Sequence, residues 1–118
     1  MQYEIWIDGS CRPKLLNKKK SNVGPSSSSF IVKQNNETVF KKAKYTGILD
    51  NNQAEYEALL MALNYVIKSD IKSVRIYTDS NLVECQMNGK YNSYSDLINN
   101  YYLQGKELLK KLESYEII

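Results

Sequence analysis

The sequence has no histidine among its 118 residues, and this absence restricts the chemistry open to the protein. It excludes Ser-His-Asp and Cys-His catalytic groups and any zinc site that needs imidazole ligands. The only cysteines, Cys11 and Cys85, are far apart and form no Cys-X-X-Cys motif, so we expect two reduced intracellular thiols. If the protein is an enzyme, carboxylates must carry its chemistry.

Long apolar runs are also absent. No stretch approaches the roughly 18 apolar residues that a membrane span needs, and the N-terminal MQYEIWIDGS lacks the features of a signal peptide. We therefore expect a cytoplasmic protein with no membrane partner. The length is typical of one domain, covering residues 1–118. A net charge of +3, with lysines gathered at positions 18–20, is a weak indication of an anionic partner.

The periodicity of the chain predicts strands and helices in the order βββαβααβ. Alternation and β-branched residues predict strands, 3.6-residue periodicity predicts helices, and residues 9–25 have the glycine, proline and lysine content of a long loop. The asparagines at 51 and 52 are expected to cap the first helix, and Ser93 and Asp96 have capping-box spacing before the last one. The expected strands are 3–8, a segment from about Ser28, 38–45, 73–79 and 114–118, and the expected helices are 51–69, 80–87 and 96–112. This order defines an α/β domain with a mixed sheet flanked by helices.

Three carboxylates occupy positions where a carboxylate is unusual. Glu55 lies on the same helical stripe as Leu59, Ala62 and Val66, which predicts that it points into the core. An unpaired buried charge is unfavourable, so this position needs an explanation. Asp8 and Asp79 each close a predicted strand, and each also has a simple structural interpretation as a strand-end or capping residue.

The three carboxylates together suggest a metal site. Two such charges about 4 Å apart repel by about 4 kcal/mol at an effective dielectric constant near 20, so converging carboxylates need protons or cations. Oxygen-only ligands favour Mg²⁺ or Mn²⁺ over zinc. Two ions about 3.5–4 Å apart are suited to phosphodiester hydrolysis, because they activate a water and stabilise the leaving oxygen.

The segments IWIDGS, NNQAEYEALLMAL and YTDSNLV, in this order and spacing, resemble the type 1 ribonuclease H domain. The resemblance implies a ribonuclease H-like fold with a five-stranded mixed sheet. It also implies a Mg²⁺-dependent endonuclease, with two ions and with Mn²⁺ as a substitute. Such an enzyme cuts the RNA strand of RNA–DNA hybrids and leaves 5′-phosphate and 3′-hydroxyl ends.

The resemblance also assigns site residues. It implies that Asp8, Glu55 and Asp79 are catalytic and bind the metals, with Glu55 near a ribose 2′-hydroxyl. It implies that the substrate is bound by Gly9, Ser10, Asn51, Asn52, Gln53 and Asn81. Contacts to phosphates and 2′-hydroxyls read a hybrid by its shape, without base specificity.

The sequence departs from the family pattern at several positions. Asp50 stands where the family often has a threonine at a phosphate pocket, and SSSSFIV replaces a glycine-rich second strand. A basic insertion between the middle helices is absent. SYEII matches the fifth strand, so the family's C-terminal helix and fourth catalytic aspartate are expected to be missing from these 118 residues. The uncovered region beside that strand is a possible homodimer contact.

Two alternatives to an active ribonuclease H remain open at this point. The first is a non-catalytic module that binds RNA–DNA hybrids. The second is another nuclease on the same fold, such as a reverse-transcriptase-associated domain. The three carboxylates do not distinguish these alternatives, because fold analogy does not determine activity.

Overall fold

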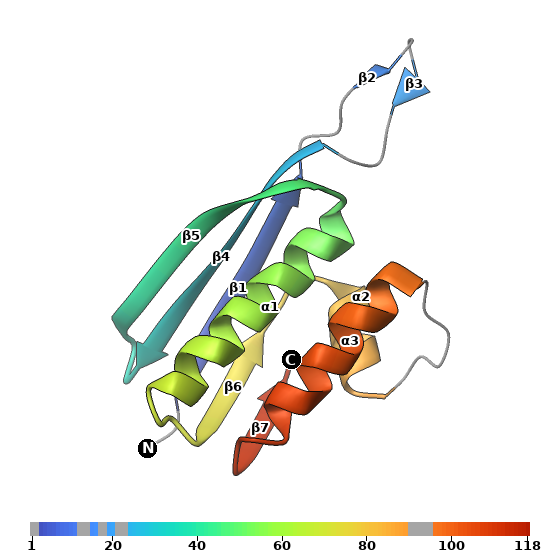
Figure 1. The fold of residues 1–118 in the computed structure, drawn as a ribbon. Helices are drawn as coiled ribbons and strands as arrows, with labels where there is room; N and C mark the ends of the chain where they lie inside the picture. Colours follow the sequence, from blue (N-terminus) through green and yellow to red (C-terminus); the bar gives the residue numbers. More distant parts are fainter. Residues whose placement is uncertain (1–2, 12–14, 17–18, 21–23, 90–95) are drawn as a thin grey trace.

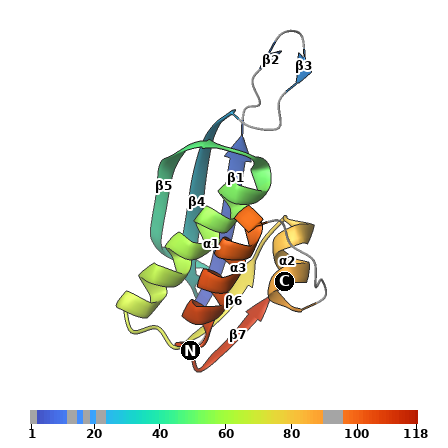
Figure 2. The ribbon, with the colours of Figure 1, turned by 45° about the vertical axis from the view of Figure 1, so that its right-hand side comes forward.

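The sheet at the centre of the molecule has five strands in the order β5-β4-β1-β6-β7, with α1 and α3 across one of its faces (Figures 1 and 2). A computed structural model describes residues 3–11, 15–16, 19–20, 24–89 and 96–118. The main strands are β1 (Tyr3–Cys11), β4 (Gly24–Gln34), β5 (Glu37–Leu49), β6 (Ser73–Tyr77) and β7 (Ser114–Ile117). The helices are α1 (Asn51–Lys68), α2 (Asn81–Met87) and α3 (Asp96–Leu109). The predicted α/β class and the predicted order of the main elements are confirmed.

The sheet is mixed, as expected. Strand β4 pairs antiparallel with both β1 and β5, whereas β6 pairs parallel with β1 and with β7. A separate short pair, β2 (Leu15–Leu16) and β3 (Lys19–Lys20), lies between β1 and β4 in the sequence. Because β1 and β6 are parallel, their carboxyl ends lie at the same end of the sheet. The site described below lies at this end.

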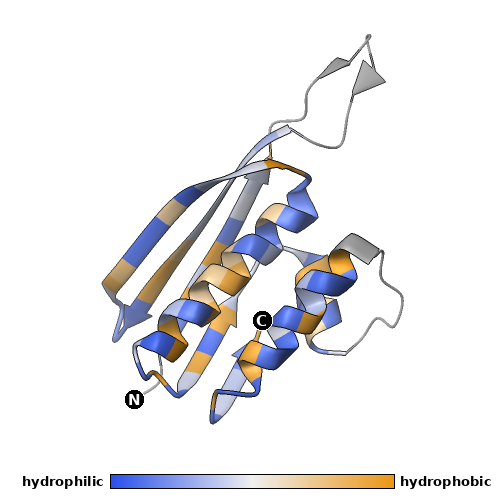
Figure 3. Cartoon of the chain, in the orientation of Figure 1, coloured by the Kyte–Doolittle hydropathy of each residue, from blue (hydrophilic) through white to orange (hydrophobic). Residues whose placement is uncertain are grey.

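The core lies between the sheet and the helices. Alternation of apolar and polar residues along the strands, visible in Figure 3, sends one side chain in two toward α1. Ile5, Val32 and Ile76 from the sheet meet Leu59 and Leu63 from α1, and all five are fully buried. No helix in the described ranges is long and apolar enough to cross a membrane.

The loop predicted for residues 9–25 is partly wrong. Strand β1 continues to Cys11 and β4 begins at Gly24, so both strands are longer than their local sequences suggest. Glycine, proline and serine are poor strand formers by themselves. Here β4 lies between β1 and β5, and backbone pairing on both sides holds it in an extended conformation.

The serine run belongs to strand β4 and alternates like the apolar residues that follow it. Ser26 and Ser28 are buried, and both hydroxyls have backbone acceptors. Ser26 Oγ donates to Gly24 O (2.9 Å), and Ser28 Oγ donates to Ala54 O in α1 (2.6 Å). A buried hydroxyl without such a partner would destabilise the fold, so these bonds explain how serines occupy core-facing positions.

The predicted helix ends are only partly correct. Helix α1 ends at Lys68, one residue before the expected end, and its N-cap is Asp50 instead of an asparagine. Helix α3 ends at Leu109, before the predicted end at Leu112, although Leu112 is still buried against the core. The predicted cap at Ser93 lies outside the described residues.

The C-terminal segment forms the fifth strand that the sequence predicts. Strand β7 pairs with β6 at one edge of the sheet, and Ile118 extends the pairing by donating to Ile76 O (2.8 Å) and accepting from Thr78 N (3.1 Å). The two cysteines lie apart: Cys11 Sγ donates to Leu49 O and Cys85 Sγ donates to Glu84 Oε2. Their reduced, intracellular state stays a prediction. The homodimer through the β7 region stays a prediction.

Candidate active site

Glu55 lies in the first turns of α1 and is buried, with 7% of its surface exposed, as its helical stripe predicts. Its carboxylate is held by two donors from different strands or strand ends. Gly9 N donates to Oε1 (2.7 Å), and Thr78 Oγ1 donates to Oε2 (3.0 Å). Burial raises the pKa of Glu55, the two hydrogen bonds oppose that rise, and the nearby charges of Asp8 and Asp79 add to it.

The start of α1 is fixed by a capping box. The Asp50 carboxylate accepts from Gln53 N (2.7 Å), and the Gln53 side chain accepts from Asp50 N (3.0 Å). These two bonds satisfy backbone donors that the first turn of a helix leaves without partners. Asp50, which the sequence comparison placed near a phosphate pocket, therefore has a structural role that accounts for the carboxylate.

Gly9 allows β1 to approach the backbone of α1 very closely. A Cβ atom at this position would lie 2.3 Å from Glu55 N and 2.4 Å from Ala54 C. Only glycine fits such an approach, because the atoms in the way are backbone atoms of a packed helix. The short Gly9–Glu55 hydrogen bond depends on this contact.

Thr78 connects the end of β6 to both Glu55 and α2. Its hydroxyl donates to Glu55 Oε2 and accepts from Ser80 N (3.0 Å). Ser80 in turn is the N-cap of α2 and accepts from Val83 N (3.2 Å). Asp79 lies between these two residues and is exposed, so the same turn that orients Glu55 also positions Asp79.

A cavity of about 390 Å³ lies where these elements meet. Asp8 and Asp79 are exposed at its rim and Glu55 is buried at its base, so the three predicted carboxylates surround one space. The residues that line it are Asp8, Gly9, Asn51, Asn52, Glu55, Asp79, Ser80, Asn81 and Leu82. Asp8 itself lies within β1, opposite Ser29, and not at the end of the strand as expected.

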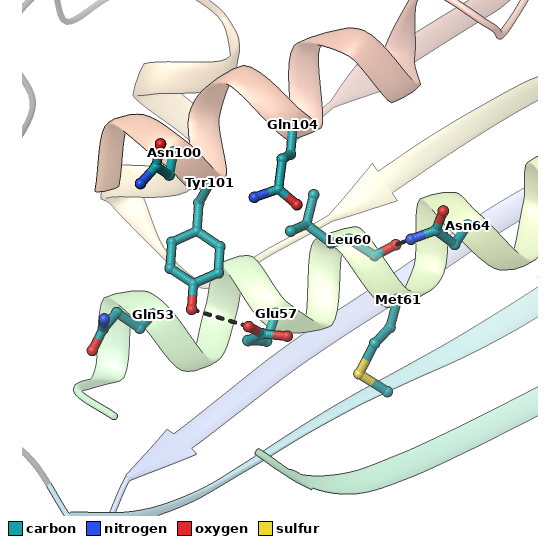
Figure 4. A pocket seen from close by; sticks show the side chains of 8 residues that line it. All are labelled: Gln53, Glu57, Leu60, Met61, Asn64, Asn100, Tyr101 and Gln104. Carbon is teal, nitrogen blue, oxygen red and sulfur yellow. Dashed lines mark hydrogen bonds between the residues drawn. The ribbon is translucent and has the colours of Figure 1, made fainter. Parts of the chain in front are cut away.

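Two predicted substrate-binding residues do not line this cavity. Ser10 is exposed, and its hydroxyl lies 3.0 Å from that of Ser27 on the neighbouring strand. Gln53 is buried, caps α1 and lines a different cavity, a groove between α1 and α3 (Figure 4). Their roles in substrate binding stay predictions.

The groove in Figure 4 also contains Glu57, which lies on α1 two residues after Glu55. Tyr101 from α3 donates its hydroxyl to Glu57 Oε1 (3.0 Å). Burial together with this hydrogen bond raises the pKa of Tyr101 to about 12, so the phenol is protonated at neutral pH. Glu57 therefore joins two helices and is separate from the three carboxylates of the cavity.

The donor set of the cavity fits a hard divalent cation, since it offers carboxylate and amide oxygens and no sulfur or imidazole. The raised pKa of Glu55 agrees with this fit, because a cation would stabilise its charged form. In the described part of the chain, however, no group of three or more acidic, cysteine or histidine side chains is placed closely enough to hold an ion. The carboxylates surround the cavity without meeting at one point.

The sequence interpretation missed Thr78 and Ser28, which orient the site without bearing a charge. Thr78 lies within the segment YTDSNLV next to Asp79, so the motif that marks the aspartate also contains this threonine. Ser28 anchors the backbone of α1 next to Glu55 through its bond to Ala54 O. A serine in a run of four had no local feature to mark this role.

We expect Thr78→Val to destabilise the protein by about 1–2 kcal/mol. The substitution keeps the shape of the side chain but removes both the donor to Glu55 and the acceptor for Ser80 N. Thr78→Ser, which retains the hydroxyl, is the matched control and should lose less. Urea unfolding of the three proteins measures the difference, and a valine variant as stable as the wild type would contradict the hydrogen-bonded role.

The mixed sheet order, with helices packed across one face of the sheet, defines a ribonuclease H-like fold. The crystal structure of RNase H1 from Halobacterium salinarum NRC-1 superposes with a TM-score of 0.88 and 24% identity, over 100% of this chain and 84% of that one. The structure of LC11-RNase H1 in complex with an RNA/DNA hybrid has a TM-score of 0.84 and 23% identity, over 98% of this chain and 83% of that one.

The chain belongs to the reverse transcriptase-like family, whose sequence model matches residues 16–118. It is also 26% identical over 99 residues to the ribonuclease HI of Halobacterium salinarum. That alignment covers 83% of this chain but 50% of the relative, so the chain spans half the length of the curated protein that it matches.

Proposed function

We propose that this protein is a divalent-metal-dependent endonuclease that hydrolyses the RNA strand of RNA–DNA hybrids. The observation that supports this most directly is the buried Glu55, oriented by Gly9 and Thr78, with Asp8 and Asp79 beside it around one cavity. The ribonuclease HI relative and the hybrid-bound LC11-RNase H1 support the same reaction and substrate.

In this proposal Asp8, Glu55 and Asp79 hold two Mg²⁺ ions, for which Mn²⁺ substitutes. When bound, the metal would supply an activated water and stabilise the leaving oxygen of the phosphodiester. The protein's own part is to keep Glu55 ionised and in place, which the donors Gly9 N and Thr78 Oγ1 favour. The exposed aspartates at the rim add negative charge that attracts the cations.

The amides around the cavity are suited to substrate contact. Asn51 and Asn52 are exposed at the start of α1, and Asn81 is exposed at the start of α2. Each side chain offers both donors and an acceptor, so it can bind phosphate oxygens and ribose hydroxyls. Contacts of this kind select a hybrid by groove shape and the 2′-hydroxyl, with no preference for base sequence.

Incubation with a labelled RNA–DNA hybrid and Mg²⁺ tests the proposal. We expect cleavage of the RNA strand to products with 5′-phosphate and 3′-hydroxyl ends, and at least a hundredfold slower cleavage by Asp8→Asn, which removes a metal-binding charge. Duplex DNA and duplex RNA of the same sequence are the substrate controls. Hybrid cleavage no faster than that of Asp8→Asn would refute the activity for this chain.

Divalent metal should also stabilise the fold. Burial, and to a smaller extent the charges of Asp8 and Asp79, raises the pKa of Glu55, so a bound cation relieves unfavourable interactions that the metal-free protein retains. Because a ligand that binds only the folded state stabilises it, we expect Tm to rise with Mg²⁺ or Mn²⁺. Thermal unfolding of the wild type and Asp79→Asn measures the effect, and an equal rise in both proteins would argue against binding at this cavity.

A second candidate function is hybrid binding without cleavage. It is favoured by the observation that, among the described residues, the acidic side chains form no group placed to hold an ion. Under this alternative the protein binds the hybrid in a gel-shift assay but produces no fragments with either metal. Family membership alone also permits another nuclease on the same fold, such as a reverse-transcriptase-associated domain. Cleavage of one of the control duplexes would indicate such a nuclease.

A further inference from the structure

The inner face of β5 is only partly covered, although it belongs to the same sheet face that α1 covers. Strand β5 is the edge of the sheet, while α1 packs over β1 and β4 (Figure 1). Phe40 and Lys42 lie on this inner face of β5, because they pair with the buried residues Val32 and Phe30. An aromatic ring and a lysine therefore face the side of α1.

The opposing side of α1 presents a matching stripe. Met61, Asn64, Tyr65 and Lys68 are spaced i, i+3, i+4 and i+7, which places them along one line of the helix. All four line a cavity of about 330 Å³ together with Phe30, Phe40 and Lys42. The cavity is thus formed by one edge strand and the second half of one helix.

The walls of this cavity are aromatic. Phe40 and Tyr65 stack in parallel, with ring centroids 4.1 Å apart and an interplanar angle of 12°. Phe30 lies against both rings in tilted arrangements, with centroids 5.7 Å from Phe40 and 5.8 Å from Tyr65. The three rings hold one another in place. Phe30 is buried, so the partly exposed Phe40 and Tyr65 form the apolar wall that a ligand can contact.

The charge of the cavity is positive. Lys42 and Lys68 line it, no carboxylate does, and within the described residues neither lysine is ion-paired. Lys44 follows on the same inner face of β5, where it pairs with the buried Ser28. The ammonium groups of Lys42 and Lys68 would both attract an anion in the cavity.

We propose that this cavity is a nucleotide-binding site, in which a base packs on the aromatic walls and a phosphate lies between Lys42 and Lys68. An aromatic wall next to two lysines that form no ion pair among the described residues matches an aromatic anion, and the volume lies within the usual range for small-ligand sites. The nucleotide is either free or the terminal residue of a nucleic acid strand, since both carry the same chemistry.

This site is separate from the carboxylate cavity and does not depend on the proposed nuclease activity. The two cavities share no residue. Asn52 and Tyr65 are both on α1, and a rise of 1.5 Å per residue puts them about 20 Å apart along the helix. Binding at one cavity therefore leaves the other accessible.

Titration of the full chain with AMP, followed by amide chemical shifts in EDTA, tests the proposal. EDTA prevents a phosphate from binding through a metal at the carboxylate cavity. We expect saturable shifts at Phe40, Lys42 and Tyr65, with a Kd below about 1 mM. Adenosine and inorganic phosphate should each bind at least tenfold more weakly, because each lacks one half of the recognised group.

Charge variants sharpen the test without disturbing the core. Lys42→Gln and Lys68→Gln should each weaken AMP binding by about three- to fivefold, whereas Lys110→Gln, an exposed lysine paired with Glu107, should not. A short single-stranded RNA that binds more tightly than AMP, with shifts at the same residues, would identify a strand end as the source of the nucleotide. No saturable shift, equal binding by Lys42→Gln, or shifts confined to the carboxylate cavity would overturn the proposal.

Discussion

Glu55→Gln is expected to reduce hybrid cleavage by at least about a hundredfold while raising the Tm of the metal-free protein. Cleavage falls because a neutral amide is a poor ligand for a divalent cation and no longer balances its charge. Stability rises because the carboxylate is buried and lies near Asp8 and Asp79, which together disfavour its charged form. A glutamine keeps an acceptor for Gly9 N and has the same length.

The pH dependence of this stabilisation follows from the direction of the pKa shift. The pKa of Glu55 in the folded protein is raised above its ordinary value of 4.5. The folded state therefore binds the proton more tightly than the unfolded state, and the wild type loses stability as pH rises through the folded-state pKa. The Tm difference between Glu55→Gln and the wild type should be largest at neutral pH and should vanish below about pH 4.5.

Glu57→Gln is the matched control, since it lies two residues away on α1 and outside the carboxylate cavity. It should retain cleavage, and its Tm should not rise, because its carboxylate accepts from Tyr101 instead of facing other acids. Equal effects of the two substitutions on cleavage would show that Glu55 has no special role. If Glu55→Gln has a lower Tm than the wild type at pH 7, the claim that the charged form of Glu55 destabilises the folded protein is wrong.

Gly9→Ala is expected to destabilise the protein by about 3 kcal/mol or more, the largest effect on stability that the structure predicts. The new methyl group would overlap the backbone at Ala54 and Glu55, with the nearest atom 2.3 Å away. To relieve the overlap, β1 and α1 must separate, which also breaks the bond from Gly9 N to Glu55. For a domain of this size we expect a fall in Tm of roughly 10 °C or more.

Gly89→Ala provides the comparison for this variant. Gly89 has a φ of +78° and nothing within 4 Å of its Cβ position, so alanine there meets only backbone strain of about 1 kcal/mol. Thermal and urea unfolding of both variants measures the difference between a steric overlap and a conformational penalty. A Gly9→Ala protein as stable as Gly89→Ala would show that the approach of β1 to α1 is not tight in solution.

Local patterns were sufficient for the features that depend on neighbours along the chain. The 3.6-residue period placed Glu55 with Leu59, Ala62 and Val66, and all four are buried. Alternation identified the five main strands, but several of their ends were wrong. Strands β1, β4 and β5 run further than predicted because neighbouring strands pair with them, and β6 ends at Tyr77, two residues before Asp79. These results follow from the geometry of single helices and strands, which residue spacing encodes directly.

The surroundings of the site depended on contacts between distant segments. Gly9 and Glu55 are 46 positions apart, and only the docking of α1 on β1 shows that the glycine is needed for space and for a hydrogen bond. Likewise, Gln53 turns away from the carboxylate cavity because it completes the cap with Asp50. Local sequence does not encode such pairings, because they depend on which elements pack together.

The sequence by itself determined the class of chemistry: without histidine, and with Asp8, Glu55 and Asp79 at positions unusual for a carboxylate, carboxylates had to carry any catalysis. Only the tertiary structure decided that these three side chains surround one cavity and that a lysine-lined aromatic cavity lies elsewhere on α1. The physical reason is that residue type and spacing fix what a side chain can do and which face it occupies. The distances between faces arise only when the sheet and helices pack together.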